Sequence, residues 1–265
     1  MKIAIIGVGN LGYSIAVGIL NQKKDIKCQA LYLTKRDTSS IAHLDKASVV
    51  KLTSDNKRAV KYSDVIIIAV LPVQLKKVLE EIKSEINPKR HTIISAVTGR
   101  KIIDIENIIG DNIPIIRAMP NTAISVSESM TCLSGNIKVK VDMIAAKTIF
   151  NALGQTLCIE EKHMQAATVI CASGIAFWMR LIRATTQGAV QLGFHSKEAQ
   201  QLSMQTCLGA AKLLIDSQNH PEQEIDKVTT PSGCTIEGLN EMEHNGLSSS
   251  LIQGLVASFE KINEI

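Results

Sequence analysis

The chain has 265 residues, of which 45% are hydrophobic and 20% are charged, and its formal net charge is +4. This is the composition of a globular protein with room for one large domain or two smaller ones. Aromatic residues make up only 3%, and no block of five like charges occurs, so a nucleic-acid-binding surface of basic and stacking side chains is not expected.

Neither a signal peptide nor a membrane span is predicted. The start, "MKIAIIGVGN", reads as a strand and a turn, and the apolar run at 65–73 is too short to cross a bilayer. The six cysteines form no CxxC pair, which favours reduced thiols and a cytoplasmic protein. The six histidines have no metal-binding spacing, so no metal site is expected.

The first part of the chain alternates between strand-like and helix-like segments. Apolar runs predict strands at 2–7, 27–34, 64–72, 91–97, 113–119 and 155–161. Helical spacing occurs at 10–22, 75–86 and 143–154, the last closed by Gly154. Strands that are buried on both faces and separated by helices predict a parallel, doubly wound α/β sheet of the Rossmann type.

After about residue 160 the strand signal stops. Helical spacing continues over 162–193 and 196–218, with Ser196 as the expected N-cap, and Pro221 is placed to open another helix. The sequence therefore predicts two domains: 1–160, which binds a dinucleotide, and 161–265, which is all-helical.

The loop "GVGNLG" carries Gly7, Gly9 and Gly12 in a G-x-G-x-x-G pattern between the first strand and the first helix. The first glycine permits a tight turn, the second lets the backbone approach a pyrophosphate, and the third lets the helix pack closely. A helix N-terminus also favours phosphate. This context predicts a dinucleotide site, with a plain glycine turn as the alternative.

The end of the second strand indicates which dinucleotide binds. An NAD site usually has an acidic residue there, but this chain has Thr34, Lys35 and Arg36. A hydroxyl and two cations suit a 2′-phosphate, so NADPH is preferred and NADH is the alternative. Asp37 comes too late to be the expected ribose ligand.

A break in the helical half stands at "KVTTPSGCTIEGLNEME", residues 227–243. Free backbone N–H groups at 232–235, ahead of a helix that begins near Thr235, would form an anion site. Local composition alone favours a simple helix cap over an anion site.

These features resemble the Δ1-pyrroline-5-carboxylate reductase family almost from end to end. The resemblance is carried by "IGVGNLG", "SDNKRAVKYSDVIIIAVLPVQL", "IIRAMPNT", "EEKHMQAATVICASGIAF" and the long block that contains "VTTPSGCTIEGLNEME". It implies NAD(P)H-dependent reduction of a cyclic imine to L-proline, the last step of proline biosynthesis. It also implies a homodimer formed by the helical domain, with larger rings of dimers in some members, and no nucleic-acid or membrane partner.

The resemblance also implies site residues. Cofactor contacts are implied for Gly7, Gly9, Asn10, Leu11, Gly12, Asn56, Ala69, Val70, Leu71, Pro72, Ala96, Val97 and Thr98. Substrate contacts are implied for Met119, Asn121, Glu161, Val228, Ser232, Gly233, Cys234 and Thr235. Thr235 is the catalytic candidate, expected beside the imine nitrogen, where its hydroxyl would orient the substrate.

The chain departs from the family pattern at several of these places. The substituted residues are Leu71, Val97, Ala123, Ile175, Ser232 and Cys234. They leave two other hypotheses open: a related NADP-dependent reductase of another imine or of a hydroxyacid, and a nucleotide-binding protein without catalysis.

Overall fold

The computed structural model describes residues 1–136 and 143–264. The chain divides into two compact units. Unit 1 comprises Met1–Ser173 together with the last residues from Phe259 onwards, and unit 2 comprises Gly174–Ser258. The units are described separately below.

Unit 1 is built on one sheet of eight described strands in the order β3-β2-β1-β4-β5-β6-β7-β8. The strands are β1 (Lys2–Ile6), β2 (Ala30–Thr34), β3 (Val50–Thr53), β4 (Val65–Ile68), β5 (Thr92–Ser95), β6 (Ile115–Met119), β7 (Ser129–Gly135) and β8 (Gly154–Cys158). The predicted strands are all present, but β3 and β7 were not expected. β3 is only four residues long, and β7 carries Ser and Thr where an apolar run would have been recognised.

The direction of β7 corrects the expectation of a wholly parallel sheet. The strands from β3 to β6 are parallel, whereas β7 runs antiparallel to β6 and β8 is parallel to β7. The connection from β6 to β7, residues 120–128, is shorter than the dozen or so residues of a parallel crossover. The chain therefore turns back along the same edge of the sheet.

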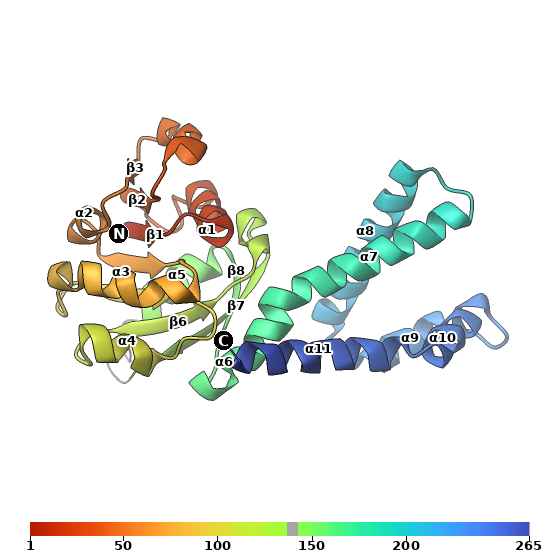
Figure 1. Ribbon diagram of the computed structural model, residues 1–265. Helices are drawn as coiled ribbons and strands as arrows, with labels where there is room; N and C mark the ends of the chain where they lie inside the picture. Colours follow the sequence, from red (N-terminus) through yellow and green to blue (C-terminus); the bar gives the residue numbers. More distant parts are fainter. Residues whose placement is uncertain (137–142, 265) are drawn as a thin grey trace. The chain divides into compact units, whose positions relative to one another are not determined.

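Helices cover both faces of this sheet (Figure 1). On one face lie α1 (Asn10–Asn21) and α5 (Met143–Asn151), and on the other lie α2 (Asn56–Lys61), α3 (Leu75–Ile82) and α4 (Ile102–Ile109). Strand β1 shows why both faces are closed: Ile3 and Ile5 enter the first core, while Ala4 and Ile6 enter the second. Continuous apolar runs are typical of strands that are buried on both sides.

Gly154 opens β8 and does not close α5, which ends at Asn151. Its φ is +140°, and a Cβ at this position would overlap the backbone of Ser129 at the start of β7. Only glycine allows this close approach of the two strands.

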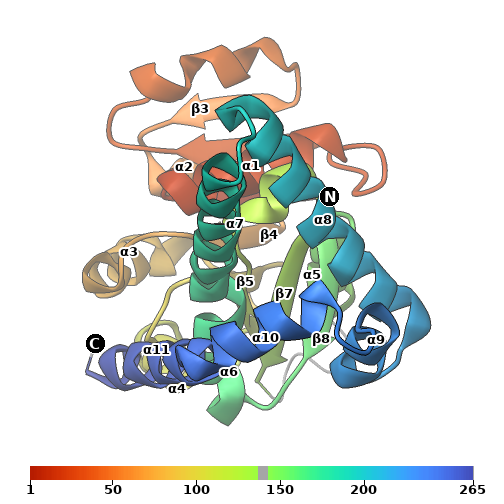
Figure 2. The ribbon, with the colours of Figure 1, turned by 90° about the vertical axis from the view of Figure 1, so that its right-hand side faces the viewer.

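After β8, unit 1 contains α6 (Met164–Ala167), which is followed by a π-helical segment, Thr168–Ser173. Unit 2 contains α7 (Gly174–Gln191), α8 (Ser196–Ser217), α9 (Pro221–Val228), α10 (Cys234–His244) and most of α11 (Leu247–Asn263). Helices α7 and α8 pack side by side (Figure 2). The N-cap of α8 is His195, not Ser196, and its N–H donates to Glu198 Oε2 at 3.4 Å. Pro221 opens α9 as predicted.

Unit 2 buries very few side chains. In α7 and α8 the buried residues are small or polar: Gly174, Thr186, Ala199 and Ser203. Many large apolar side chains of these helices are exposed instead, among them Trp178, Leu208 and Leu213. Helices in this state need a further surface to cover them.

One helical run, Glu161–Gln191, is long and apolar enough to cross a membrane by length and composition alone. The expectation of no membrane span rested on the run at 65–73, which forms β4 and the turn after it, and it overlooked this longer segment. Length and composition are weak evidence, because helices of soluble proteins pass the same test.

Candidate active site

The glycine loop after β1 has the geometry that its spacing predicts. Gly7 has φ +93°, and a Cβ there would lie 2.5 Å from Val70 Cγ1. A Cβ on Gly12 would overlap the carbonyl oxygen of Gly7. The first glycine is therefore required by the turn, and the third by the contact between α1 and the loop.

Gly9 differs from both of these glycines. It is the N-cap of α1, it is exposed, and an added Cβ would meet no atom within 4 Å. The first turn of α1 contains no acidic residue. An open glycine at a helix N-terminus fits a phosphate group, because backbone N–H groups and the helix dipole both favour an anion. The loop therefore fits the pyrophosphate of a dinucleotide.

The ends of the parallel strands bring further predicted cofactor residues to the same edge. Ile6 pairs with Thr34 and with Ile68, and Ile68 pairs with Ser95. The residues that follow are therefore neighbours in one row: Gly7, Lys35, Ala69 and Ala96. The strand order reverses between β1 and β4, and ligands of open α/β sheets bind at such a switch point.

Thr34 takes a different position from the one expected of a phosphate ligand. It is buried, and its hydroxyl accepts a hydrogen bond from the Gly7 N–H at 3.2 Å. Its carbonyl accepts from the N–H groups of Gly7 and Val8 at 3.2 and 3.0 Å. Thr34 therefore holds the glycine loop in place by these hydrogen bonds instead of facing a 2′-phosphate.

The two cations after β2 remain available for an anion. Lys35 Nζ donates to Ser40 Oγ at 2.7 Å, and Arg36 is exposed. The Asp37 carboxylate accepts from the Ser39 N–H and hydroxyl, both at 2.9 Å, and these bonds lower the pKa of Asp37. The Asp37 carboxylate is thus engaged in its own turn.

The remaining predicted cofactor residues lie at the start of α2 and in the segments that follow β4 and β5. Asn56 opens α2, and its Nδ2 donates to Glu81 Oε2 at 3.1 Å. Leu71 projects into solvent with 64% of its surface exposed, and its N–H donates to Gln74 Oε1. Residues 96–98 follow β5 directly.

The turn after β6 is held by Asn121. Its N–H donates to Ser129 Oγ, its Oδ1 accepts from the Ala123 N–H, and its Nδ2 donates to the carbonyl oxygen of Cys171. Met119, at the end of β6, is buried. Asn121 therefore fixes this turn to both β7 and the π-helical segment.

Glu161 forms an ion pair with a buried arginine. Arg117, in the middle of β6, is buried, and its Nη1 donates to Glu161 Oε1 at 3.1 Å. The same oxygen accepts from the Ile102 N–H at 2.7 Å. Glu161 thus joins the start of α4 to β6, a structural role that sequence reasoning did not expect.

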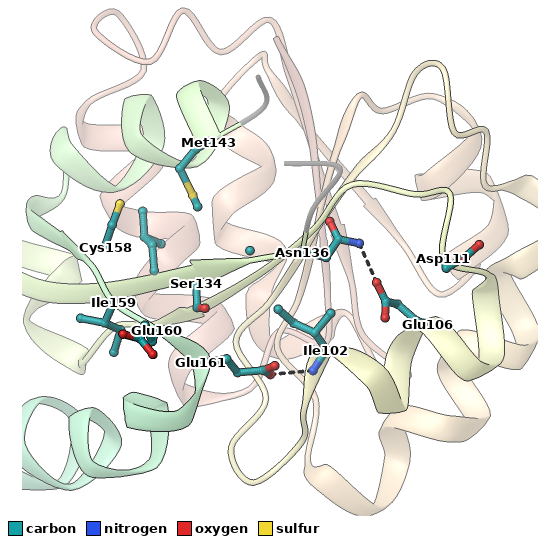
Figure 3. A pocket seen from close by; sticks show the side chains of 12 residues that line it. Ile102, Glu106, Asp111, Ser134, Asn136, Met143, Cys158, Ile159, Glu160 and Glu161 are labelled. Carbon is teal, nitrogen blue, oxygen red and sulfur yellow. Dashed lines mark hydrogen bonds between the residues drawn. The ribbon is translucent and has the colours of Figure 1, made fainter. Parts of the chain in front are cut away.

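A cavity of about 960 Å³ opens next to Glu161 (Figure 3). Its walls come from α4, β7, β8 and the start of α5, and Asn136 there donates to Glu106 Oε1 at 2.8 Å. Among the predicted site residues it contains only Glu161. The cavity is therefore not the dinucleotide edge of the sheet.

In unit 2 the predicted substrate loop connects α9 to α10. Val228 ends α9, Ser232 has φ +58°, Gly233 is the N-cap of α10, and Cys234 and Thr235 form its first turn. One of the four expected free donors is used within the loop, because the Gly233 N–H donates to the Thr230 carbonyl at 2.9 Å.

The other donors of this loop are available. Among the residues that the structure describes, the N–H groups of Ser232, Cys234 and Thr235 have no acceptor. A Cβ on Gly233 would overlap Thr230 Oγ1, so this position requires glycine. The loop therefore presents a preformed row of three backbone donors.

Two family models match separate parts of the chain. One, described as NADP oxidoreductase coenzyme F420-dependent, matches residues 2–99. The other, described as pyrroline-5-carboxylate reductase dimerisation, matches residues 161–265. The two matches fall on the α/β half and the helical half.

Whole-chain relatives decide the family. Pyrroline-5-carboxylate reductase 2 of Dictyostelium discoideum is 43% identical over 275 residues, which cover 98% of this chain and 91% of that protein. The chain belongs to the pyrroline-5-carboxylate reductase family. Pyrroline-5-carboxylate reductase 1 of the same organism is 44% identical, and the chain spans about half (49%) of its length.

A solved structure of this family has the same fold. Pyrroline carboxylate reductase from Plasmodium falciparum, with NADP bound, aligns with a TM-score of 0.89 at 26% identity, over 100% of this chain and 97% of that one. The expected architecture, a Rossmann-type dinucleotide-binding domain followed by an all-helical dimerisation domain, is confirmed. The dimerisation model begins at residue 161, while the compact units divide after Ser173.

Sequence reasoning missed Arg117 and the pair formed by Cys132 and Cys171. Arg117 had a visible signal: a cation inside the apolar strand "IPIIRAM" needs an acidic partner when it is buried. The cysteine pair had no signal in the sequence, because its two members are 39 residues apart.

Proposed function

We propose that this chain reduces L-1-pyrroline-5-carboxylate to L-proline with a nicotinamide cofactor, the last step of proline biosynthesis. The observation that carries the proposal is the open glycine loop at the switch point of the sheet, in a chain whose whole-length relatives are named pyrroline-5-carboxylate reductases. The two alternatives, a reductase of another substrate and a non-catalytic nucleotide-binding protein, receive no support from these relatives.

The cofactor edge of unit 1 would bind and orient the dinucleotide. Backbone N–H groups of Asn10 to Gly12, at the start of α1, would bind the pyrophosphate. When bound, the reduced nicotinamide supplies the hydride. We propose further contacts at Asn56, at 69–72 and at 96–98, and a nicotinamide-facing role for Met119 and Asn121.

We also propose that NADPH is preferred over NADH. Lys35 and Arg36 follow β2 at the position where an acidic residue would favour NADH. Two cations there stabilise a 2′-phosphate by charge-assisted hydrogen bonds.

A double variant tests this preference. Replacing both Lys35 and Arg36 with Ala should weaken NADPH binding at least tenfold and leave NADH binding within about twofold, because only NADPH carries the 2′-phosphate. Fluorescence titration with both cofactors measures the ratio of the two affinities. If the ratio of the two affinities is unchanged, the charges of Lys35 and Arg36 do not determine the preference for NADPH.

The substrate would be held by the loop of unit 2. The N–H groups of Ser232, Cys234 and Thr235 are suited to the carboxylate, and the Thr235 hydroxyl to the imine nitrogen. A hydroxyl is a weak acid, so Thr235 orients the imine and relays a proton through water instead of acting as a strong general acid. Val228, Gly233 and Glu161 complete the proposed substrate set.

Thr235→Ala is the direct test of this loop. Turnover of pyrroline-5-carboxylate should fall at least tenfold, while the affinity for NADPH stays unchanged, because the hydroxyl would act on the imine alone. Thr229→Ala is the matched control, since the Thr229 hydroxyl already donates to the Asp226 carbonyl. Equal turnover of the Thr235 variant and wild type would exclude the proposed role.

At the level of the whole chain we propose residues 1–160 as the nucleotide-binding domain and 161–265 as the domain through which two copies associate. The apolar side chains that unit 2 exposes would be covered by the second copy. A ring of such dimers and a cytoplasmic location belong to the same proposal, the latter supported by six free cysteines.

A further inference from the structure

Two cysteines that are distant in the sequence meet in unit 1. Cys132 lies on β7 and Cys171 lies in the π-helical segment, and their Sγ atoms are 4.0 Å apart. A disulfide requires about 2.05 Å, so the two sulfur atoms must approach by roughly 2 Å. The segment that contains Cys171, Thr168–Ser173, is a π-helical turn. Such turns often occur at functional sites.

The surroundings of the two thiols permit this movement. Cys132 is paired with Met119 across β6 and β7, and it shares a small cluster with Met164 and Ala167. Methionine side chains are flexible and refill space when a neighbour moves. The pair is therefore packed among adaptable side chains and not among rigid rings.

The two thiols differ in exposure and in chemistry. Cys132 is 3% exposed, whereas Cys171 is only half-buried. The hydrogen bond from the Cys132 thiol lowers the pKa of Cys171 to about 7, while the same bond and burial raise the pKa of Cys132. The negative charge belongs on Cys171, because the more exposed sulfur keeps more of its hydration.

We propose that Cys132 and Cys171 form a reversible intramolecular disulfide when the protein meets a hydroperoxide, with Cys171 as the attacking thiol and Cys132 as the resolving thiol. The site belongs to this chain's own packing, and formation of the disulfide requires no step of the imine reduction.

The reaction balances in two steps. The Cys171 thiolate attacks one peroxide oxygen, the O–O bond breaks, and the leaving hydroxide takes a proton to become water, which leaves a sulfenic acid. Cys132 sulfur then attacks Cys171 sulfur, so that the S–S bond forms and the S–O bond breaks. The second hydroxide leaves as water with the proton of the Cys132 thiol. Two thiols lose two electrons, and the peroxide is reduced to water.

The disulfide would connect two segments that already hold the turn after β6. Asn121 donates to the carbonyl oxygen of Cys171 and to Ser129 at the start of β7. A covalent bond between β7 and the π-helical segment would therefore fix the surroundings of Asn121 in one arrangement.

Peptide mapping of the full-length protein tests the proposal. The protein is treated with hydrogen peroxide, blocked with N-ethylmaleimide and digested with trypsin without reduction. Cleavage yields peptides 118–138 and 163–180, each with one cysteine, and we expect them as one cross-linked species that dithiothreitol separates. Thiols titrated in denaturant should fall by two from the six of the reduced chain.

Variants make the result specific. Cys132→Ser should abolish the cross-link and leave a sulfenic acid on Cys171 that dimedone traps, and Cys171→Ser should leave Cys132 unmodified. Cys158→Ser, at an exposed cysteine, should cross-link as wild type does. Circular dichroism confirms that each variant is folded. A wild-type map in which Cys132 stays reduced, or in which Cys171 couples to another cysteine, overturns the proposal.

Discussion

At the scale of single residues, Gly9 and Gly12 serve different needs although they belong to one motif. A side chain on Gly12 would overlap the backbone of Gly7, whereas a side chain on Gly9 would enter open space. Gly12 is therefore required by the fold, whereas Gly9 leaves open the space in which we propose that a phosphate group binds.

Alanine at each position should separate these demands. Gly9→Ala should leave the thermal midpoint unchanged but weaken NADPH binding at least tenfold, because the Cβ occupies the phosphate position. Gly12→Ala should lower the free energy of unfolding by about 2 kcal/mol or more, because α1 must shift. Thermal melts and cofactor titrations measure both effects. A destabilised Gly9→Ala protein with normal NADPH affinity would contradict this division of roles.

His91 provides a pH-dependent contribution to stability. It is buried at the start of β5, and Asn87 N–H donates to its Nδ1 at 3.0 Å. Burial, and then the charge of Arg90, lower its pKa. The folded state therefore binds a proton less readily than the unfolded state, whose histidine pKa is about 6.5. Stability is complete above that pH and is lost as the pH falls from about 6.5 towards the lower folded pKa.

Urea unfolding at pH 7.5 and pH 5.5 measures this contribution. The loss of unfolding free energy between the two pH values should be smaller in His91→Gln than in wild type, because glutamine does not take up a proton. His163→Gln, at an exposed histidine, is the control and should follow wild type. The same pH slope in all three proteins would show that His91 is not involved.

At the scale of elements, the ion pair of Arg117 and Glu161 joins parts that are far apart in the chain. It connects β6 to the residues before α6, and Glu161 also accepts the Ile102 N–H at the start of α4. Among the described residues, Arg117 Nε and Nη2 are buried without a partner. Glu161 is then the main compensation for a buried cation.

Removing the charge of Glu161 should therefore be costly. Glu161→Gln should lower the free energy of unfolding by about 2–4 kcal/mol, because the Arg117 guanidinium stays buried without a counter-charge. The double variant with Arg117→Met should be more stable than Glu161→Gln alone, which a double-mutant cycle by urea unfolding measures. If Glu161→Gln keeps full stability and raises only the KM for the imine, the substrate contact is the main role of Glu161.

At the scale of the whole molecule, the exposed apolar side chains of unit 2 are the property that needs a second copy. Trp178 and Leu213 are 59% and 60% exposed, and the matched dimerisation model covers both. Large apolar side chains exposed in such number on the matched dimerisation segment indicate an association surface.

A charged residue on this surface should prevent association. Trp178→Glu is expected to run as a monomer at micromolar concentration where wild type runs as a dimer or larger, because a carboxylate in an apolar interface loses its hydration. Light scattering after size-exclusion chromatography measures the mass. Ile144→Glu is the control, since Ile144 is 70% exposed on α5 outside the matched segment. Dimeric Trp178→Glu would place the interface elsewhere.

Local patterns were sufficient for much of this protein. The glycine spacing, the apolar strand runs and the helical second half can each be recognised within twenty or thirty residues. They correctly predicted an α/β domain followed by a helical domain, and the resemblance along almost the whole chain correctly indicated the family. They failed at β3 and at β7, where a short strand and a polar strand carry little periodic signal.

The sequence by itself determined the fold class, the family and the position of the glycine loop, because the patterns that indicate them lie in continuous stretches of the chain. Only the tertiary structure decided that Thr34 supports Gly7, that Glu161 neutralises Arg117, and that Cys132 meets Cys171. The members of these pairs are 27, 44 and 39 residues apart. Contacts over such distances depend on how strands and helices pack, and no local pattern records them.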